Sequence, residues 1–301
     1  ITEISCCSTA LTFTQLSKYG KTGWFWFFTI CTAWLPVALS SHVSIDQGWK
    51  SFAVLYLNTE FGKGVSQEFV HAMKSLGGPP VNSVAFNEGQ TSYAAVVSKA
   101  MESKPDALFV VAEAREGAVL VREWLSMGGT QNLLLNNALR SDLFIKNVGA
   151  EYLSKSWGVD FSPAKGPSTD AFAERYKQKF GAEPNGPGLN NIYDAVVLAA
   201  LAMQAAPNPV TGTGVRDNVR RMLDPAGAIS RPGAKGIRSA LDAIKAGQKV
   251  HYVGATGLTS FDENGDITSP MMLWRIVDGK IKSDSVLSVE EVTALTRKVG
   301  R

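Results

Sequence analysis

Short apolar runs alternate with helix-like stripes between residues 50 and 162. The run from Phe52 to Leu57 is followed at once by apolar residues at helical spacing, from Val65 to Leu76, before the sequence GGPP ends the stripe. Further strands are predicted in the same way at 81–86, 107–112 and 132–135. Because strands that alternate with helices of about ten to fifteen residues form βαβ units, the pattern predicts a parallel sheet. The near-continuous apolar character of the strands predicts helices on both faces of that sheet.

Beyond residue 162 the pattern changes to helices with few strands. Helices are predicted from Ser168 or Thr169 to Gly181, and at 190–206, 214–223 and 236–247. The chain then closes with two strand-like runs, which the dipeptide Asn264-Gly265 predicts to be a hairpin. Helices that arrive without strands lack the sheet that they should cover, so this part cannot form a complete second α/β lobe.

Polar residues follow three of the predicted strands. They are the segments 58–61 (NTEF), 113–116 (EARE) and 136–137 (NN). Ligands of an open parallel sheet bind outside the carboxyl ends of its strands, so these segments predict the wall of a cleft. The helices that follow offer N-terminal amide groups, which favour a carboxylate or another anion. The alternative is that the segments are ordinary polar loops, which are common in α/β proteins.

Residues 1–40 have a different character. Two lysines precede the apolar sequence WFWFFTICTAWLPVALSS, which is shorter than the roughly 20 residues of a membrane span. A basic flank, an apolar core and a small-x-small ending at Ala38 and Ser40 resemble a secretory signal peptide. Because the chain begins with Ile1, a wrong reading frame or chimeric sequence is a second interpretation, and a membrane anchor is a third. This segment is therefore left out of the predicted fold.

Composition and charge are those of an ordinary globular protein. The chain has 301 residues, an apolar fraction of 45% and a formal net charge of +3, which suit one large or two medium domains. The small positive charge is spread along the chain, so we expect neither a nucleic acid nor an anionic membrane as partner. The cysteines are Cys6, Cys7 and Cys31. The rest of the chain therefore has no disulfide framework, cysteine metal site or cysteine nucleophile.

The sequence carries no recognisable catalytic constellation. GKGVSQ lacks the third glycine of a dinucleotide-binding fingerprint, and neither a G-x-x-x-x-G-K-[ST] loop nor a G-x-S-x-G elbow occurs. The histidines at 42, 71 and 251 are isolated and show no metal-ligand spacing. Asp262, Asn264 and Asp266 have the first spacings of a calcium loop, but its later glycine and glutamate are absent. We therefore predict a protein that is not an enzyme and holds no metal or cofactor.

Several stretches between Ile45 and Ile281 share their order with a known family. They are DQGWKSFAVLYLNTEFGKG, PDALFVVAEAREGAVLVREWLSMG, SDLFIKNVGAEYL, NNIYDAVVLAALAM and GATGLTSFDENGDITSPMMLWRIVDGKI. In this order they resemble the type I periplasmic solute-binding proteins, the branched-chain amino-acid receptor group of ABC transporters. The resemblance implies two α/β lobes, joined by crossing strands, that close on a small solute.

The resemblance also divides the chain. It implies lobe 2 at 41–162, the remainder of lobe 1 at 163–264, and return strands with a C-terminal tail at 265–301, after an unmatched leader at 1–40. Family members carry most of the lobe 1 sheet ahead of DQGWKS, where this chain has only that leader. We therefore expect a bilobed type I periplasmic-binding fold with doubly wound parallel sheets and an incomplete lobe 1. The helix at 190–203 is then expected to expose an apolar face.

The resemblance also implies ligand-binding residues in lobe 2. Phe61 stands where the family often has a ligand-covering tyrosine, so it can stack on a ligand but cannot donate a hydrogen bond. Asn137 falls near a family position that can be acidic and meet an ammonium group. An amide cannot pair with a charge, so Glu113 or Glu116 is expected to supply it instead.

Tyr193 matches a cleft-side aromatic residue of the family, whereas Asp194 beside it is expected to cap its helix. We thus expect a periplasmic receptor, secreted across the inner membrane, that delivers a small amino acid, amide or carboxylate to an ABC transporter permease. It is expected to be a monomer with a small-molecule ligand and no cofactor. The alternatives are a ligand-sensing domain of a signalling or regulatory protein and an enzyme on a doubly wound sheet, which the missing motifs disfavour.

Overall fold

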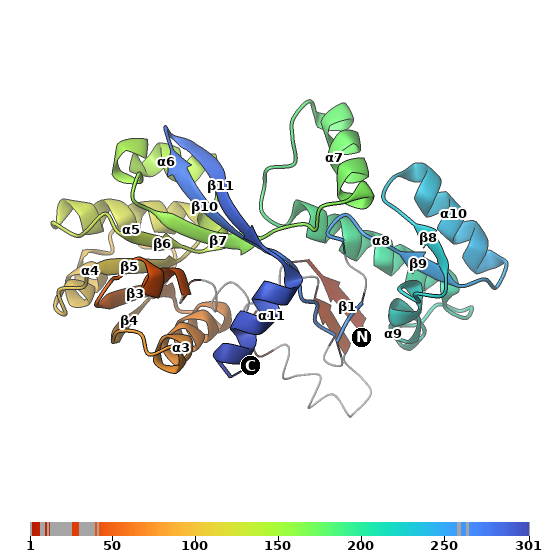
Figure 1. The fold of residues 1–301 in the computed structure, drawn as a ribbon, viewed down its shortest axis with the longest axis horizontal. Helices are drawn as coiled ribbons and strands as arrows, with labels where there is room; N and C mark the ends of the chain where they lie inside the picture. The colour runs from red at the N-terminus through yellow and green to blue at the C-terminus, as the bar shows by residue number, and fades with distance from the viewer. Residues whose placement is uncertain are drawn as a thin grey trace. The chain divides into compact units, whose positions relative to one another are not determined.

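The computed structural model contains two compact units. Unit 1 comprises Ile1–Thr32 and Ser162–Ser269, and unit 2 comprises Ala33–Phe161 and Pro270–Arg301 (Figure 1). The structure describes residues 2–6, 10, 12, 26–29, 40, 42–257, 260–262 and 265–300. Each unit takes its residues from two separated parts of the sequence. The boundaries between the units after Phe161 and Ser269 compare with the boundaries expected from the sequence, after residues 162 and 264.

Unit 2 is built on a seven-stranded sheet with the strand order β11-β10-β7-β6-β5-β3-β4. Its strands are β3 (Phe52–Leu57), β4 (Val81–Phe86), β5 (Ala107–Val111), β6 (Leu133–Leu135), β7 (Trp157–Phe161), β10 (Met271–Val277) and β11 (Lys280–Leu287). The pairs from β4 to β7 are parallel, whereas β10 is antiparallel to both β7 and β11. The predicted α/β class with a doubly wound sheet is confirmed, because the strand order reverses direction at β3.

Helices cover both faces of this sheet. They are α3 (Glu60–Ser75), α4 (Ala94–Met101), α5 (Ala114–Ser126), α6 (Asp142–Val148) and α11 (Val289–Lys298), with the short 3-10 helices η2 (Asn137–Leu139) and η3 (Ala150–Tyr152). Ala53 and Leu55 of β3 share a core with Trp124 of α5. Successive strand side chains point to opposite faces, and Phe52 accordingly contacts Phe69 of α3 at a ring-centroid distance of 5.6 Å. Because both faces are covered, all residues of β5 are buried.

The C-terminal hairpin lies later in the sequence than predicted. β10 and β11 are joined at Asp278 and Gly279, whose φ angles are 53° and 72°. Two consecutive residues with positive φ suit a tight hairpin turn, and Asp-Gly adopts that conformation readily. The chain does reverse at the predicted turn, because the Asp262 backbone N–H donates to the Asp266 carbonyl oxygen at 2.8 Å and the Gly265 backbone N–H donates to the Asp262 carbonyl oxygen at 3.2 Å. The strands expected on either side of this turn are not observed, since the described residues 260–262 and 265–270 form none. The Asp266 backbone N–H also donates to Asp262 Oδ1 at 2.9 Å.

Unit 1 is mainly helical in its described part. Its elements are β1 (Thr2–Ser5), β2 (Trp26–Thr29), α7 (Pro167–Phe180), α8 (Leu189–Ala205), α9 (Gly212–Val219), η4 (Arg220–Met222), β8 (Ala228–Ser230), α10 (Ala234–Lys245) and β9 (Val250–Tyr252). The described strands form two parallel pairs, β1 with β2 and β8 with β9. Leu198 and Leu201 of α8 share a core with Tyr252 of β9. α7 ends at Gly181, as predicted, with a φ of 69° that glycine adopts without strain.

Most of the apolar sequence at 24–41 lies outside the described residues. The predicted signal peptide and its two alternatives, a shifted reading frame and a membrane anchor, therefore lie outside the described residues. Of its described residues, Trp26–Thr29 form strand β2. Among the residues that the structure describes, no helix is both long enough and apolar enough to cross a membrane.

Candidate functional site

The three polar segments that follow the strands lie next to one another in unit 2. They leave β3, β5 and β6, which are neighbours in the parallel sheet, so their carboxyl ends meet at one edge (Figure 1). The strand order reverses at β3, which places a topological switch point between the exits of β3 and β5. Ligands of open α/β sheets bind at this position. The edge carries Phe61, Glu113 and Asn137, and we take it as the candidate site.

The first segment of this edge is held close to its strand by a glycine. Thr59 precedes α3, and its hydroxyl oxygen accepts a hydrogen bond from the Gly62 backbone N–H at 3.2 Å. A Cβ atom on Gly62 would stand only 1.9 Å from the carbonyl oxygen of Leu57, so no larger residue fits without a shift of the backbone. This tight turn places Phe61 in the first turn of α3, where its ring is half-buried. Asn58 donates to the side chain of Asn87 at 3.0 Å.

The second segment presents an acidic group to solvent. Glu113 stands at the N-cap of α5, but its side chain makes no capping hydrogen bond and is exposed. Partial desolvation, with the charge on Glu116 as a second cause, raises the pKa of Glu113. Because a nearby cation would relieve both effects, Glu113 is suited to meet an ammonium group.

The two asparagines of the third segment differ in their surroundings. Asn136 is buried, and its side-chain nitrogen donates to the carbonyl oxygens of Ala112 at 3.0 Å and Val110 at 3.3 Å in the orientation that satisfies the amide. Asn136 therefore fastens the end of β6 to the end of β5. Asn137 follows as the first residue of η2 and is half-buried at the edge.

The same edge contains a buried ion pair that the sequence did not predict. Arg140, directly after η2, donates through Nε to Asp160 Oδ2 at 2.5 Å, and Asp160 is only 1% exposed at the end of β7. The backbone N–H of Phe161 donates to the other carboxylate oxygen at 2.7 Å. Burial raises the pKa of Asp160 to about 6, and Arg140 opposes this only in part. Arg140 follows the polar segment 136–137 closely in the sequence, but no sequence signal linked it to Asp160.

Tyr193 belongs to unit 1, whereas the other three predicted residues share the edge in unit 2. Its hydroxyl oxygen accepts a hydrogen bond from the Gly233 backbone N–H at 2.8 Å, and its ring lies 5.0 Å from that of Phe172. Tyr193 therefore joins α8 to α7 and to the start of α10.

The expected capping role of Asp194 is wrong. Asp194 lies inside α8 and is fully buried, and its carboxylate accepts hydrogen bonds from the Tyr252 hydroxyl, the backbone N–H groups of Ala255 and Thr256, and the Thr256 hydroxyl. Burial raises the pKa of Asp194, and these hydrogen bonds oppose the shift. A Cβ atom on Gly254 would lie 2.3 Å from an Asp194 oxygen, so the loop approaches the carboxylate closely only with glycine there. Asp194 thus organises the loop after β9.

The site can therefore offer the aromatic ring of Phe61, the amide of Asn137 and the carboxylate of Glu113 to a small molecule. Among the described residues, no group of three or more histidine, cysteine, aspartate or glutamate side chains is placed to hold a metal ion. Polar groups at the switch point of a doubly wound sheet are the usual position of a small-molecule site in an α/β protein.

The chain belongs to the periplasmic binding protein family, because the family model described as periplasmic binding protein matches residues 7–280. The resemblance that the sequence predicted is thereby confirmed. The match begins inside the segment 1–40 and includes most of it. The family is one of solute-binding receptors that act outside the cytoplasm. No curated protein matches the chain by sequence.

Solved structures of similar fold include several receptors of this kind. The leucine-binding protein LivK of Thermotoga maritima has a TM-score of 0.70 and 20% identity, over 95% of this chain and 79% of that one. LivJ of Streptococcus pneumoniae in complex with isoleucine has a TM-score of 0.68 and 20% identity, over 95% and 71%. A solute-binding protein of R. palustris in complex with 4-hydroxybenzoate has a TM-score of 0.64 and 17% identity, over 95% and 71%. These likenesses confirm the type I periplasmic-binding fold.

Proposed function

We propose that this protein is an extracytoplasmic receptor that binds a small amino acid, amide or carboxylate and delivers it to an ABC transporter permease. The observation that carries this proposal is the meeting of three polar strand exits at the switch point of the unit 2 sheet. Membership of the periplasmic binding protein family supports the same class of function.

The chemistry of the edge favours a ligand with an apolar body and a carboxylate. Phe61 offers a ring on which an aliphatic or aromatic body can pack. α3 and α5 begin at this edge, and backbone N–H groups at helix N-termini favour a negative group, although Glu60 and Glu116 in the first turns offset part of that effect. The structures solved with isoleucine and with 4-hydroxybenzoate contain ligands of this type. Isoleucine also carries an ammonium group, for which Glu113 is the proposed partner.

The mechanism that we propose is closure on the ligand. A ligand stabilises the conformation for which it has the higher affinity, so binding shifts the population towards that conformation. The residues that we assign to ligand contact are Phe61, Glu113 and Asn137 in unit 2 and Tyr193 in unit 1. The closed, liganded protein is then the form that a permease recognises, and the protein acts as a monomer.

Isothermal titration tests the ligand class. We expect heat of binding with leucine, isoleucine or 4-hydroxybenzoate, and none with their analogues that lack the carboxylate, which are 3-methylbutylamine, 2-methylbutylamine and phenol. Glu113→Gln should weaken an amino acid at least tenfold, which is about 1.4 kcal/mol, and should leave 4-hydroxybenzoate within twofold. Glu102→Gln is the matched control, because Glu102 is also exposed but lies at the C-terminal end of α4. Absence of binding to every amino acid, amide and short carboxylic acid would refute the proposal.

Delivery to a permease requires its own measurement. ATP hydrolysis by the cognate ABC transporter in proteoliposomes should rise when the liganded protein is added, and should not rise with ligand alone. An unchanged rate with a protein that binds its ligand would retain the binding function and refute delivery.

A further inference from the structure

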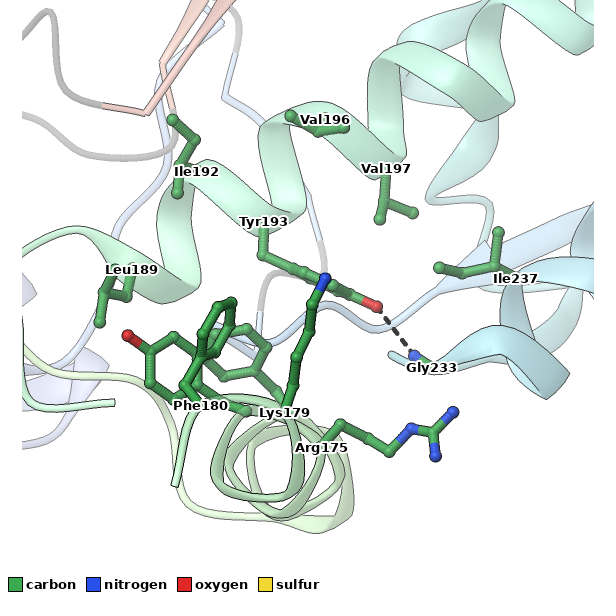
Figure 2. A pocket seen from close by; sticks show the side chains of 12 residues that line it. Arg175, Lys179, Phe180, Leu189, Ile192, Tyr193, Val196, Val197, Gly233 and Ile237 are labelled. Atoms are coloured by element: carbon green, nitrogen blue, oxygen red, sulfur yellow. Dashed lines mark hydrogen bonds between the residues drawn. The ribbon is translucent and has the colours of Figure 1, made fainter. Parts of the chain in front are cut away.

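Unit 1 contains an apolar groove that shares only Tyr193 with the residues assigned to the proposed receptor function. It has a volume of about 540 Å³ and lies between α7, α8 and the start of α10 (Figure 2). Its floor and one wall include the rings of Phe172, Tyr176, Phe180 and Tyr193. Every lining residue belongs to unit 1, so the groove is complete within that unit.

The aromatic wall follows from the spacing of residues along α7. Phe172, Tyr176 and Phe180 are four residues apart, which places them on one face of the helix. Their neighbouring ring centroids are 5.9 Å and 4.6 Å apart, so they form a continuous apolar strip. The last ring of this strip, Phe180, is 60% exposed. An exposed aromatic side chain at the end of a groove is a surface on which an apolar group can pack.

The facing wall is the exposed side of α8. Ile192 and Val196 are four residues apart on this helix and are 51% and 62% exposed. The apolar face that the sequence predicted for this helix is thus confirmed. Figure 2 shows both side chains along α8, with Tyr193 turned toward Gly233. The groove therefore has apolar groups on two helices that leave space between them.

Positive charge stands at the rim of this apolar space. Arg175 and Lys179 line the groove from α7 and are exposed, and no acidic residue is among the lining residues. Neither cation forms an ion pair with a carboxylate among the described residues. Arg175 contacts the side-chain oxygen of Gln178 at 3.4 Å, and Lys179 lies 5.4 Å from the ring centroid of Phe180. By contrast, Lys177 on the same helix is paired with Glu183.

The helix that begins at the groove adds charge of the same sign. Gly233, the N-cap of α10, lines the groove, and the first turn of α10 contains no acidic residue. A helix N-terminus carries a partial positive charge that is not offset here. Figure 2 shows Lys179 extending from α7 in the direction of α8, and Arg175 on the side of α10.

We propose that the groove is a second binding site, which takes an organic anion with an apolar body, such as a medium-chain fatty carboxylate. The carboxylate lies at Arg175 and Lys179, and the hydrocarbon packs between the α7 rings and the exposed face of α8. Sites for small molecules commonly have volumes of about 300–1,000 Å³, apolar linings and a few polar groups that orient the ligand, and this groove has those properties. The charge of the rim complements the anion, and burial of the hydrocarbon supplies about 25 cal/mol per Å² of apolar area.

The test is an NMR titration of the full chain with octanoate, with octan-1-ol as the uncharged analogue. We expect octanoate to shift the amide resonance of Gly233 and to saturate, and octan-1-ol to bind at least tenfold more weakly. The double variant Arg175→Gln/Lys179→Gln should weaken octanoate at least tenfold and leave octan-1-ol within twofold. Lys165→Gln/Lys177→Gln removes the same charge from exposed positions outside the lining and should bind octanoate like the wild type.

A second variant tests the apolar wall. Val196→Glu places a negative charge at a position that is 62% exposed, so the fold should tolerate it while octanoate binding falls at least tenfold. Circular dichroism melting curves establish that each variant is folded. Absence of saturable octanoate binding by the wild type would overturn the proposal. Octanoate binding of wild-type strength in both the double variant and Val196→Glu would also overturn it. Saturable shifts of the Phe61 and Asn137 amide resonances with an unshifted Gly233 would place the anion at the unit 2 edge and also overturn the proposal. Amino-acid titrations on the same variants keep the two proposals separate.

Discussion

Arg140 and Asp160 form a buried ion pair across the carboxyl edge of the unit 2 sheet, with the two side chains 13% and 1% exposed. Arg140 comes from the segment after β6 and Asp160 from the end of β7, so the pair joins the exits of two neighbouring strands. Because the pair borders the polar segments of the candidate site, its charge state contributes to the electrostatic field there.

The pair should make folding stability depend on pH. The pKa of Asp160 is raised from 3.8 to about 6 in the folded protein, so the native state binds the proton more tightly than the unfolded chain. This contribution to stability is fully present below the unfolded pKa and is lost as pH rises toward 6, a change of about 3 kcal/mol at most. Urea unfolding at pH 4, 5, 6 and 7 should show this loss, and Asp160→Asn should reduce it. An identical pH profile in the variant would contradict the assignment.

Replacement of Asp194 should destabilise unit 1 strongly. Asp194→Ala leaves the Tyr252 hydroxyl and the backbone N–H groups of Ala255 and Thr256 without their acceptor in the protein interior. Buried donors that lose a charged partner cost about 3 kcal/mol or more in total. Chemical unfolding followed by circular dichroism measures the change. Asp217→Ala, at an exposed position on α9, should change the free energy of unfolding by less than about 0.5 kcal/mol. Similar midpoints for the two variants would count against the interior role.

The tight turn after β3 should not accept a side chain. Gly62→Ala places a methyl group 1.9 Å from the Leu57 carbonyl oxygen, so the start of α3 must move away from the strand. We expect a loss of about 2–4 kcal/mol in the free energy of unfolding and weaker ligand binding through Phe61. Gln67→Ala is an exposed change in the same helix and should be neutral or slightly stabilising. A Gly62→Ala protein with unchanged stability and affinity would mean that the turn relaxes freely.

Removal of the Tyr193 hydroxyl separates its two contacts. Tyr193→Phe loses the hydrogen bond from Gly233 and keeps the ring that packs on Phe172, so the free energy of unfolding should fall by about 0.5–1.5 kcal/mol. Ligand affinity should remain within twofold, because the hydroxyl is already engaged by the backbone. Thermal melting and isothermal titration give the two quantities. A larger loss of affinity than of stability would show that the hydroxyl contacts the ligand.

The unit 2 sheet was predictable because its signals are local. Each buried strand is a continuous apolar run, and each run ends at polar residues that must leave the sheet at its carboxyl edge. The adjacency of the exits of β3, β5 and β6 follows from parallel pairing, so Phe61, Glu113 and Asn137 could be placed together in advance. A glycine shortly after an apolar run, as Gly62 is after β3, is another local signal, because it indicates a tight turn from the strand into the next helix.

Long-range partners were not predictable from the same signals. Asp160 lies one residue before the end of a strand, and only the tertiary fold shows that Arg140 reaches it. Asp194 occupied a sequence position typical of the first turns of a helix, but α8 begins at Leu189, so its carboxylate lies inside the helix and binds a distant loop. The chain turns at both the Asn-Gly and the Asp-Gly sequence, but the paired strands flank only Asp278-Gly279, which turn propensity alone does not decide.

The antiparallel pairing of β10 with β7 has a consequence for synthesis of the chain. Met271 is opposite Phe161 and Trp274 is opposite Gly158, although the whole of Ser162–Ser269 is translated between these strands. Until β10 emerges, β7 is an open edge with unpaired backbone groups, and an open edge can pair with another nascent chain. Unit 2 is thus an interrupted domain, and its sheet is completed only after Ser162–Ser269 has been made.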